Sequence, residues 1–281
     1  VLPMASLILL VRQHNNRLAW EDPTQRSFAL AHQLDRALLL GHPPTLPGWE
    51  ITAHSEPGLV VGRIFYDALL GVDGCLSLIL GEMNTHAAGG NDGVAAVLSM
   101  VEARTLLRGG TRSLLSPAHA LELANRSLCP DMAPGDFVAC LCCALDPVQG
   151  TVQIGNAGQI RPLQVAAAGG VEIVGGQDPP LGLHLDCPYS EFSCTLAPGD
   201  FLFLYSSGVV DACSATGESF GLARLEQTLS TPVREGAQKL QAVADTIREF
   251  VGGAWAGDRD AIMIVLERLP LATAAGPSQG T

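Results

Sequence analysis

The sequence contains few basic side chains. Lysine and arginine together number 16, against 28 aspartates and glutamates, which gives a formal net charge of −12 and a pI near 4.9. Proteins that bind nucleic acids or anionic membranes neutralise phosphate groups with lysine and arginine, and a chain of this charge repels those surfaces. The composition therefore predicts no nucleic-acid partner and no membrane partner.

The sequence also lacks a long hydrophobic run and a metal-type cysteine pattern. The apolar run Leu7 to Val11 is far shorter than the roughly 20 residues that cross a bilayer, and no signal-peptide cleavage pattern follows Arg12. Eight cysteines form no CxxC pair, and the seven histidines show no zinc-like spacing beside them. The simplest expectation is a protein of the reducing cytoplasm.

Apolar residues, by contrast, are plentiful. Of the 281 residues 47% are hydrophobic, which is enough to bury a large core. Cys140, Cys142 and Cys143 lie in one apolar run, and strand alternation predicts that the first two share a face as small core residues. We therefore expect most of the chain to be folded.

Four short motifs stand out by their order and spacing. They are Val61 to Asp67 (VGRIFYD), Leu80 to Ala87 (LGEMNTHA), Tyr205 to Val209 (YSSGV) and Gly257 to Ile262 (GDRDAI). This set resembles the PPM-type serine/threonine phosphatases, in the bacterial branch typified by SpoIIE, where the motifs read approximately VGGDFYD, GDVSGKG, YTDGV and DDxT. In that family an aspartate of each motif binds a pair of Mg²⁺ or Mn²⁺ ions.

The metal-binding positions of the family are mostly replaced in this sequence. Carried over residue by residue, they fall on Ile64, Glu82, Ser207 and Arg259, so one carboxylate is kept. A pair of hard divalent ions needs several converging carboxylates. Isoleucine has no lone pair, serine is a weak neutral ligand, and a guanidinium about 4 Å from a divalent ion is repelled by roughly 8 kcal/mol at an effective dielectric near 20. The motifs therefore predict a degenerate metal site without catalytic residues.

The resemblance extends from Leu34 to Leu269. Further matching segments are the strand region 137–146, the Asn-Ala-Gly turn 156–158, the Pro-Pro-Leu-Gly segment 179–182 and the segment 197–204. Gln159 stands where the family often has histidine. The resemblance implies an α+β fold, a four-layer αββα sandwich in which two stacked antiparallel sheets are flanked by helices, and the alternation of strand and helix signals agrees with it.

The domain organisation follows from this extent. We expect an N-terminal extension with a hairpin at 1–22, a linker helix at 23–44, the PPM-like domain at 45–269 and a disordered tail at 270–281. Leu30, Leu34 and Leu38 form an apolar stripe on the helix expected at 23–41. In the resembling family this helix often supports dimers, and packing on its own domain is the alternative.

Local signals place the elements around the motifs. We expect strands at 50–55, 59–69, 76–80 and 261–268, a turn at Asp73 and Gly74, helices at 92–108, 117–128, 222–229 and 235–251, and further strands between 137 and 206. Ser116 is the expected N-cap of the second helix, and Gly109 with Gly110 the expected stop of the first. Glu82 is expected in the loop after the third strand.

With one family acid kept, the sequence predicts a pseudophosphatase. Such a domain keeps the fold, binds no cofactor and acts by binding a protein in a bacterial signalling pathway. In the resembling family the substrates are often phosphorylated anti-sigma-factor antagonists, so the resemblance implies such a protein, or a related regulator, as the partner.

Two alternatives remain open. One is an active phosphoserine/phosphothreonine phosphatase whose rearranged site holds Mn²⁺ or Mg²⁺ on Glu82, Asp258 and Asp260, with Asp67 as a further ligand, because a one-residue shift of the last motif presents those aspartates in place of the arginine.

The other alternative is a different chemistry on the same scaffold. Ser207 would be its nucleophile and His86 a nearby base, but the GxSxG sequence of a nucleophile elbow is missing. The glycine-rich segment 87–93 lacks the GKS or GKT end of a P-loop, which favours a flexible loop over a phosphate cradle.

Overall fold

Two antiparallel sheets form the centre of the molecule. The computed structural model describes residues 43–56, 64–85, 93–113, 116–231, 236–253 and 260–270, and these ranges contain two five-stranded sheets. In sheet A the strand order is β1 (Trp49–Glu56), β10 (Ala261–Arg268), β9 (Phe201–Tyr205), β6 (Leu163–Val165) and β7 (Val171–Ile173). In sheet B it is β2 (Ile64–Leu70), β3 (Leu76–Asn84), β4 (Phe137–Asp146), β5 (Thr151–Ala157) and β8 (Glu191–Thr195).

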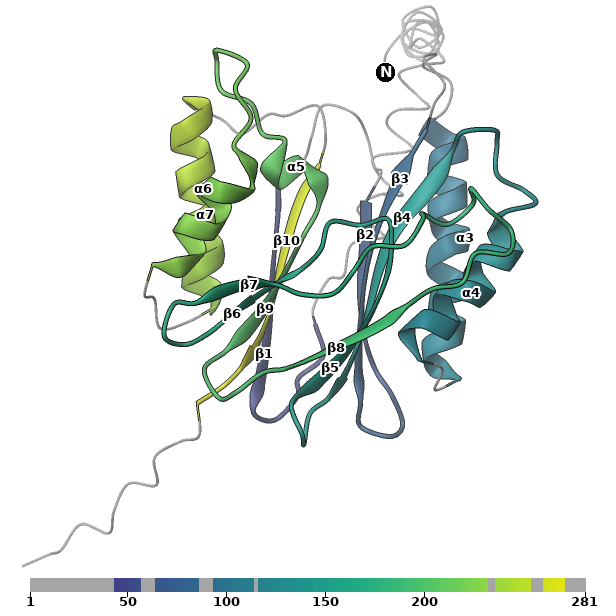
Figure 1. Ribbon diagram of the computed structural model, residues 1–281, viewed down its shortest axis with the longest axis horizontal. Coiled ribbons are helices and arrows are strands. Elements are labelled where there is room, and N and C mark those ends of the chain that lie inside the picture. Colours follow the sequence, from purple (N-terminus) through teal and green to yellow (C-terminus); the bar gives the residue numbers. More distant parts are fainter. Residues whose placement is uncertain are drawn as a thin grey trace, which may run out of the picture.

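Helices cover the outer face of each sheet (Figure 1). Helices α3 (Gly93–Arg112) and α4 (Pro117–Leu128) pack on sheet B, while α5 (Ser207–Val210), α6 (Gly221–Ser230) and α7 (Gly236–Val251) lie on the side of sheet A. This order of layers confirms the expected αββα sandwich. No helix among the described residues combines the length and apolar character needed to cross a membrane.

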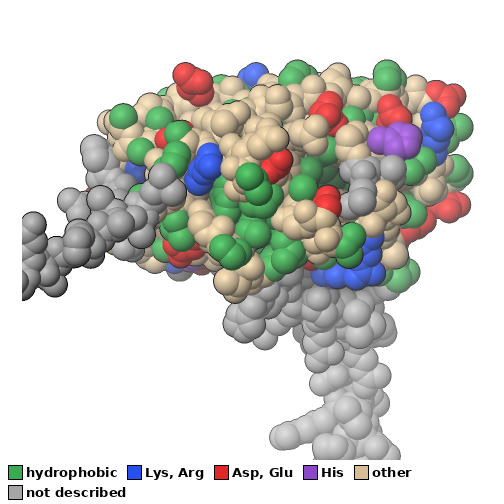
Figure 2. All heavy atoms as spheres, turned by 90° about the horizontal axis from the view of Figure 1, so that it is seen from below, with side chains coloured by type: hydrophobic (Ala, Val, Ile, Leu, Met, Phe, Trp, Pro, Cys, Tyr) green, Lys and Arg blue, Asp and Glu red, His purple; other side chains and the backbone are tan. Residues whose placement is uncertain are grey.

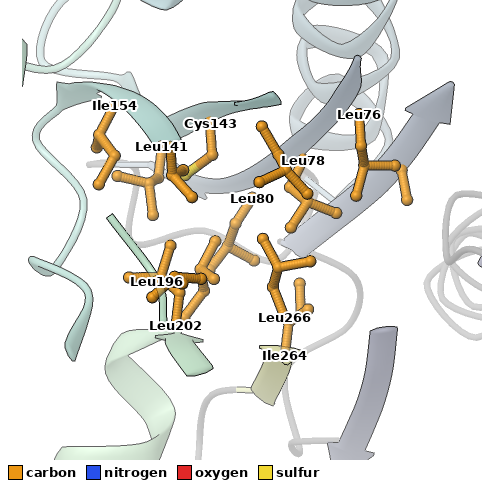
Figure 3. Packing of buried hydrophobic residues seen from close by; sticks show 14 of the residues in the cluster. Leu76, Leu78, Leu80, Leu141, Cys143, Ile154, Leu196, Leu202, Ile264 and Leu266 are labelled. Carbon is orange, nitrogen blue, oxygen red and sulfur yellow. The ribbon is translucent and has the colours of Figure 1, made fainter. Parts of the chain in front are cut away.

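Three apolar clusters fill the three interfaces between the layers. The cluster between the sheets includes Leu78, Leu80, Leu141, Ile264 and Leu266, whose side chains meet from both sides (Figure 3). A second cluster joins sheet B to α3 and α4, and a third joins sheet A to α6 and α7. Burial of apolar area at about 25 cal/mol per Å² makes these interfaces the main source of stability.

The cysteine run follows the expected alternation. Cys140 and Cys142 belong to the cluster under α3 and α4, with their Sγ atoms 4.0 Å apart, and Cys143 belongs to the cluster between the sheets. All three are free thiols in the core. Burial raises the pKa of the Cys140 and Cys143 thiols well above the usual value, which keeps them protonated and chemically quiet.

Several expected elements occur where the sequence placed them, and two differ. Helix α4 spans the expected residues with Ser116 as its N-cap, and β10 also matches. Helix α3, however, does not stop at Gly109 and Gly110 but runs through both to Arg112. Its buried residues Met100, Ala103 and Leu107 pack on sheet B, and this packing outweighs a cost of about 1 kcal/mol for each helical glycine.

The second difference concerns Glu82, which was expected in a loop. Strand β3 continues past Leu80 to Asn84, and Glu82 lies inside it, paired with Ile64 on one side and Ala139 on the other. Hydrogen bonding to two neighbouring strands extends β3 beyond the point where local sequence signals end. The family-motif acid is therefore fixed by the sheet.

The end of the sandwich away from Glu82 carries the hairpin tips. The turn at Asp73 and Gly74 is confirmed, and the Gly71 N–H donates to the Cys75 carbonyl at 2.8 Å. Val72 at this tip is 97% exposed, and Val148 at the neighbouring β4–β5 tip is 84% exposed. Figure 2 views this end and shows hydrophobic side chains gathered near its middle.

Some expectations concern residues outside the described ranges. They include the N-terminal extension 1–22, the linker helix 23–44 except its last two residues, the tail 271–281, the start of the strand expected at 59–69, the segment 87–92, and the side chains of His86, Asp258 and Arg259. The expected dimer contact through 23–41 belongs to this group. These expectations stay predictions.

Candidate functional site

Two of the four family positions face each other in sheet B. Ile64 opens β2, and its register partner in β3 is Glu82. The Ile64 side chain is 2% exposed and belongs to the apolar cluster between the sheets. Since residues opposite each other in adjacent strands project to the same face, Glu82 also projects toward sheet A.

A third family position reaches the same place from sheet A. Ser207 begins α5, directly after Ser206, whose backbone N–H donates to the Ile262 carbonyl at 3.0 Å. The Ser206 hydroxyl donates to the Asp260 carbonyl at 3.2 Å and accepts from the Ile262 N–H at 2.9 Å. These bonds tie the start of α5 to the start of β10 and fix the direction of Ser207.

Glu82 and Ser207 meet across the two sheets. The Ser207 hydroxyl donates to Glu82 Oε1 at 2.8 Å, and the Ser207 backbone N–H donates to Glu82 Oε2 at 3.4 Å. Glu82 is 4% exposed, so water has little access to its carboxylate. We call this pair of residues the cross-sheet contact.

Asp67, the further ligand of the active-enzyme alternative, lies elsewhere. It is three residues after Ile64 on β2, so it projects from the opposite face of sheet B, toward α3. Its Oδ2 lies 3.0 Å from an Nη atom of Arg108 and 3.2 Å from Nε of Arg104, and its Oδ1 accepts from the Ala68 N–H at 3.1 Å. The expectation that Asp67 shares a metal with Glu82 is therefore wrong, because the two carboxylates project from opposite faces of sheet B.

The contacts of Asp67 with the arginines are electrostatic. Asp67 is 1% exposed, and neither guanidinium meets it with hydrogen-bond geometry, although both lie within ion-pair distance. Arg104 and Arg108 were not among the residues that the sequence motifs indicated. The available signal was their spacing of four residues, which puts both on one side of a helix.

The donor set can be compared with what two divalent ions require. At the three described family positions the side chains are an apolar isoleucine, one carboxylate and a serine hydroxyl that donates to that carboxylate. Within the part of the chain that the structure describes, no three His, Cys, Asp or Glu side chains gather as a metal site would need. These residues do not fit a pair of Mg²⁺ or Mn²⁺ ions.

The fourth family position is only partly described. Arg259 and Asp258 lie outside the described residues, and so does His86. Asp260 is described, and its backbone carbonyl accepts the Ser206 hydroxyl. The structure thus brings together Ile64, Glu82 and Ser207, and places the backbone of Asp260 beside Ser206.

Comparison with known proteins gives a family and a set of structural relatives. Residues 89–269 match the family model described as Stage II sporulation protein E (SpoIIE). Protein IcfG from Synechocystis sp. is 26% identical over 255 residues, which cover 80% of this chain and 39% of that protein. The chain therefore spans less than half the length of this curated relative.

Solved structures with the same fold include phosphatase domains. The SiaA-PP2C domain of Pseudomonas aeruginosa has a TM-score of 0.69 at 21% identity, covering 87% of this chain and 96% of that one. The RsbU and RsbW domains of Rv1364c from Mycobacterium tuberculosis give 0.65 at 23% identity, covering 81% and 62%. The phosphatase domain of SpoIIE from Bacillus subtilis gives 0.58 at 13% identity, covering 83% and 98%. At these identities the likeness concerns the fold.

Proposed function

Because the chain belongs to the Stage II sporulation protein E (SpoIIE) family and has the PPM phosphatase fold, we propose that it is a pseudophosphatase of bacterial signalling. It keeps the fold of the family, holds no pair of catalytic metal ions, and acts by binding a protein partner. Its catalytic turnover of phosphoserine or phosphothreonine is absent or strongly impaired.

One observation carries this proposal: the position opposite Glu82 is a buried isoleucine. In the family both positions are metal-binding aspartates. The Ile64 side chain packs into the core between the sheets and offers no oxygen. Two divalent ions need carboxylates from several directions to balance their charge, and Ile64 provides none from its side of the site.

The contact made by Glu82 points the same way. Both of its carboxylate oxygens accept from Ser207. An ion bound to Glu82 would lie beside a neutral hydroxyl that is held in place by the hydrogen bonds of Ser206. Ser207 is neutral, so it would not balance the positive charge of the ion as an aspartate does.

The proposed partner is a protein of the class that SpoIIE-like phosphatases act on. One structural relative contains RsbU and RsbW domains in a single chain, which supports a place in a regulatory pathway of this kind. An anti-sigma-factor antagonist, or a related regulator, is the partner that we propose. The net charge of −12 disfavours nucleic acid as the partner.

A phosphatase assay tests the proposal directly. Phosphoserine and phosphothreonine peptides are incubated with the full chain and millimolar Mn²⁺, and released phosphate is measured against a metal-free blank. We expect no turnover above the blank. Manganese-dependent turnover that is abolished by Glu82→Ala would instead establish the alternative, an active enzyme with a site made of Glu82, Asp258 and Asp260.

A restored site gives a matched positive control. The variant Ile64→Asp/Ser207→Asp/Arg259→Asp returns the family acids to the three replaced positions. We expect Mn²⁺ to raise the melting temperature of this variant and to leave that of the wild-type chain unchanged. A ligand at 100 times its dissociation constant stabilises by about 2.7 kcal/mol, which is readily measured. A manganese-induced rise in the melting temperature of the wild-type chain as large as that of the variant would refute the proposal.

A further inference from the structure

We propose that the cross-sheet contact between Glu82 and Ser207 fastens the two sheets to each other without metal, at the place where the resemblance puts the metal ligands. Glu82 belongs to β3 of sheet B, and Ser207 begins the helix that follows β9 of sheet A. The inference rests on the proposed function in one respect: it requires that Glu82 holds no pair of metal ions.

The backbone next to Glu82 and next to Ser207 is closely packed. Glu82 follows Gly81, where an added Cβ would lie 2.2 Å from the Phe65 ring. Ser207 precedes Gly208, where an added Cβ would lie 2.4 Å from the Asp260 carbonyl oxygen. The two glycines therefore allow β3 to lie against Phe65 and α5 to lie against the start of β10. Because neither backbone can shift easily, the two side chains meet in a fixed geometry.

The surroundings make the contact matter for stability. Glu82 is nearly inaccessible to water and lies on the face of sheet B that carries the apolar cluster between the sheets. A carboxylate in such a place must be compensated by hydrogen-bond donors, and hydrogen bonds to charged groups contribute more than neutral ones. Ser207 provides two donors, its hydroxyl and its backbone N–H. Loss of the hydroxyl removes the shorter of these two hydrogen bonds.

The hydrogen bonds from Ser207 join the two sheets directly, whereas metal ligands would join them through ions. A divalent ion takes carboxylate oxygens at about 2 to 2.6 Å, with the lone pairs directed at the ion. The Ser207 hydroxyl donates to Oε1 at 2.8 Å. The cross-sheet contact thus replaces the connection that metal ligands from both sheets would make through shared ions. It is a property of the apoprotein.

A double-mutant cycle on the full chain tests the contact. Unfolding in urea is measured for the wild type, Ser207→Ala, Glu82→Met and the double variant, in buffer containing a metal chelator. We expect Ser207→Ala to raise the unfolding equilibrium constant about 10- to 100-fold in the wild type. In the Glu82→Met background the same change should have an effect of less than about 2-fold. Independent effects of the two substitutions would overturn the proposal.

Ser206 supplies the matched control. Its hydroxyl bonds within sheet A, to Asp260 and Ile262, and not to Glu82. Because Ser206 acts on Glu82 only by positioning Ser207, Ser206→Ala should couple to Glu82→Met less strongly than Ser207→Ala does. Ser207→Thr, which keeps a hydroxyl, should recover most of the loss caused by Ser207→Ala. Equal losses for Thr and Ala would contradict a role for the hydroxyl.

A second measurement applies if Ser207→Ala does not fold. Hydrogen exchange of the wild-type chain should protect the Ser207 amide as strongly as the Ile262 amide, which bonds to Ser206. Rapid exchange at Ser207 alone would overturn the proposal.

The proposed function has a separate readout. Coupling between Glu82 and Ser207 together with a manganese-induced rise in melting temperature would uphold the contact and refute the pseudophosphatase. Absence of coupling together with an unchanged melting temperature in manganese would refute the contact and uphold the pseudophosphatase.

Discussion

Two buried carboxylates on neighbouring strands of sheet B are stabilised in different ways. Asp67 on β2 faces α3 and meets the guanidinium groups of Arg104 and Arg108. Glu82 on β3 faces the other sheet and meets the hydroxyl and backbone N–H of Ser207. The contacts of Asp67 with the arginines are between opposite charges, and the contacts of Glu82 with Ser207 are hydrogen bonds.

The difference bears on what each acid can do. Asp67 connects β2 to α3, and its charge is already balanced by side chains that are 18% and 31% exposed. Glu82 lies at a position that binds metal in the resembling family, but its register partner is Ile64. Among the residues that the structure describes, neither acid belongs to a group of three His, Cys, Asp or Glu side chains that could hold a metal ion.

The largest effect on the free energy of unfolding is expected from a second acid on the face of sheet B that meets sheet A. Ile64→Asp removes a buried apolar side chain and places an uncompensated carboxylate next to Glu82. We expect a loss of at least about 4 kcal/mol in the free energy of unfolding, measured in urea at neutral pH. Ile64→Val is the control and should cost about 1 kcal/mol. A loss as small as that of the valine variant would contradict the buried position of Ile64.

The outer face should show the next largest effect. In Arg104→Met/Arg108→Met the carboxylate of Asp67 stays buried without its cations. We expect a loss of about 3 kcal/mol in unfolding free energy, because breaking a buried ion pair leaves an uncompensated charge. Adding Asp67→Leu should recover most of the loss, since apolar replacement of a whole buried pair is close to neutral. A triple variant as unstable as the double would show that the arginines act by packing instead.

A third buried charged residue, Lys239, should have a smaller effect on the free energy of unfolding. Its Nζ donates to the carbonyls of Leu229, at 2.6 Å, and of Thr231, at the C-terminal end of α6. Burial lowers the pKa of Lys239 below its ordinary value of 10.5. Between the folded and unfolded pKa values the unfolded chain binds more protons, so this residue's contribution to stability rises as pH increases toward 10.5.

The variant Lys239→Met isolates that contribution. The unfolding free energy of the wild type minus that of the variant should increase with pH below 10.5, by about 1.4 kcal/mol for each pH unit by which burial lowers the pKa. Urea unfolding between neutral pH and pH 10 measures this difference. A difference that falls as pH rises would show that the pKa is raised instead, as for an ion-paired lysine.

Local sequence signals predicted those parts of the fold that local interactions decide. Helix α4 begins after Ser116, whose side chain accepts from the His119 N–H, and this cap was readable from the sequence. The end of α3 was not, because packing of Leu107 on sheet B carries the helix through two glycines. Long-range pairing likewise draws Glu82 into β3, although the sequence had placed it in the loop after that strand.

The candidate site was predicted in part for the same reason. Motif positions placed Ile64, Glu82 and Ser207 in one site, and the fold brings them together. The hydrogen bonds between Glu82 and Ser207 join residues 125 positions apart, and the sequence contains no local signal for them. The ion pairs of Asp67 depend on α3 lying over β2, which only the packing of the layers determines.

Calorimetric titration of the full chain with Mn²⁺ tests the proposal that too few acids converge between the sheets to hold a pair of divalent ions. We expect only heat of dilution up to millimolar Mn²⁺ and an unchanged melting temperature. Saturable binding of two ions that is lost in Glu82→Ala would contradict it.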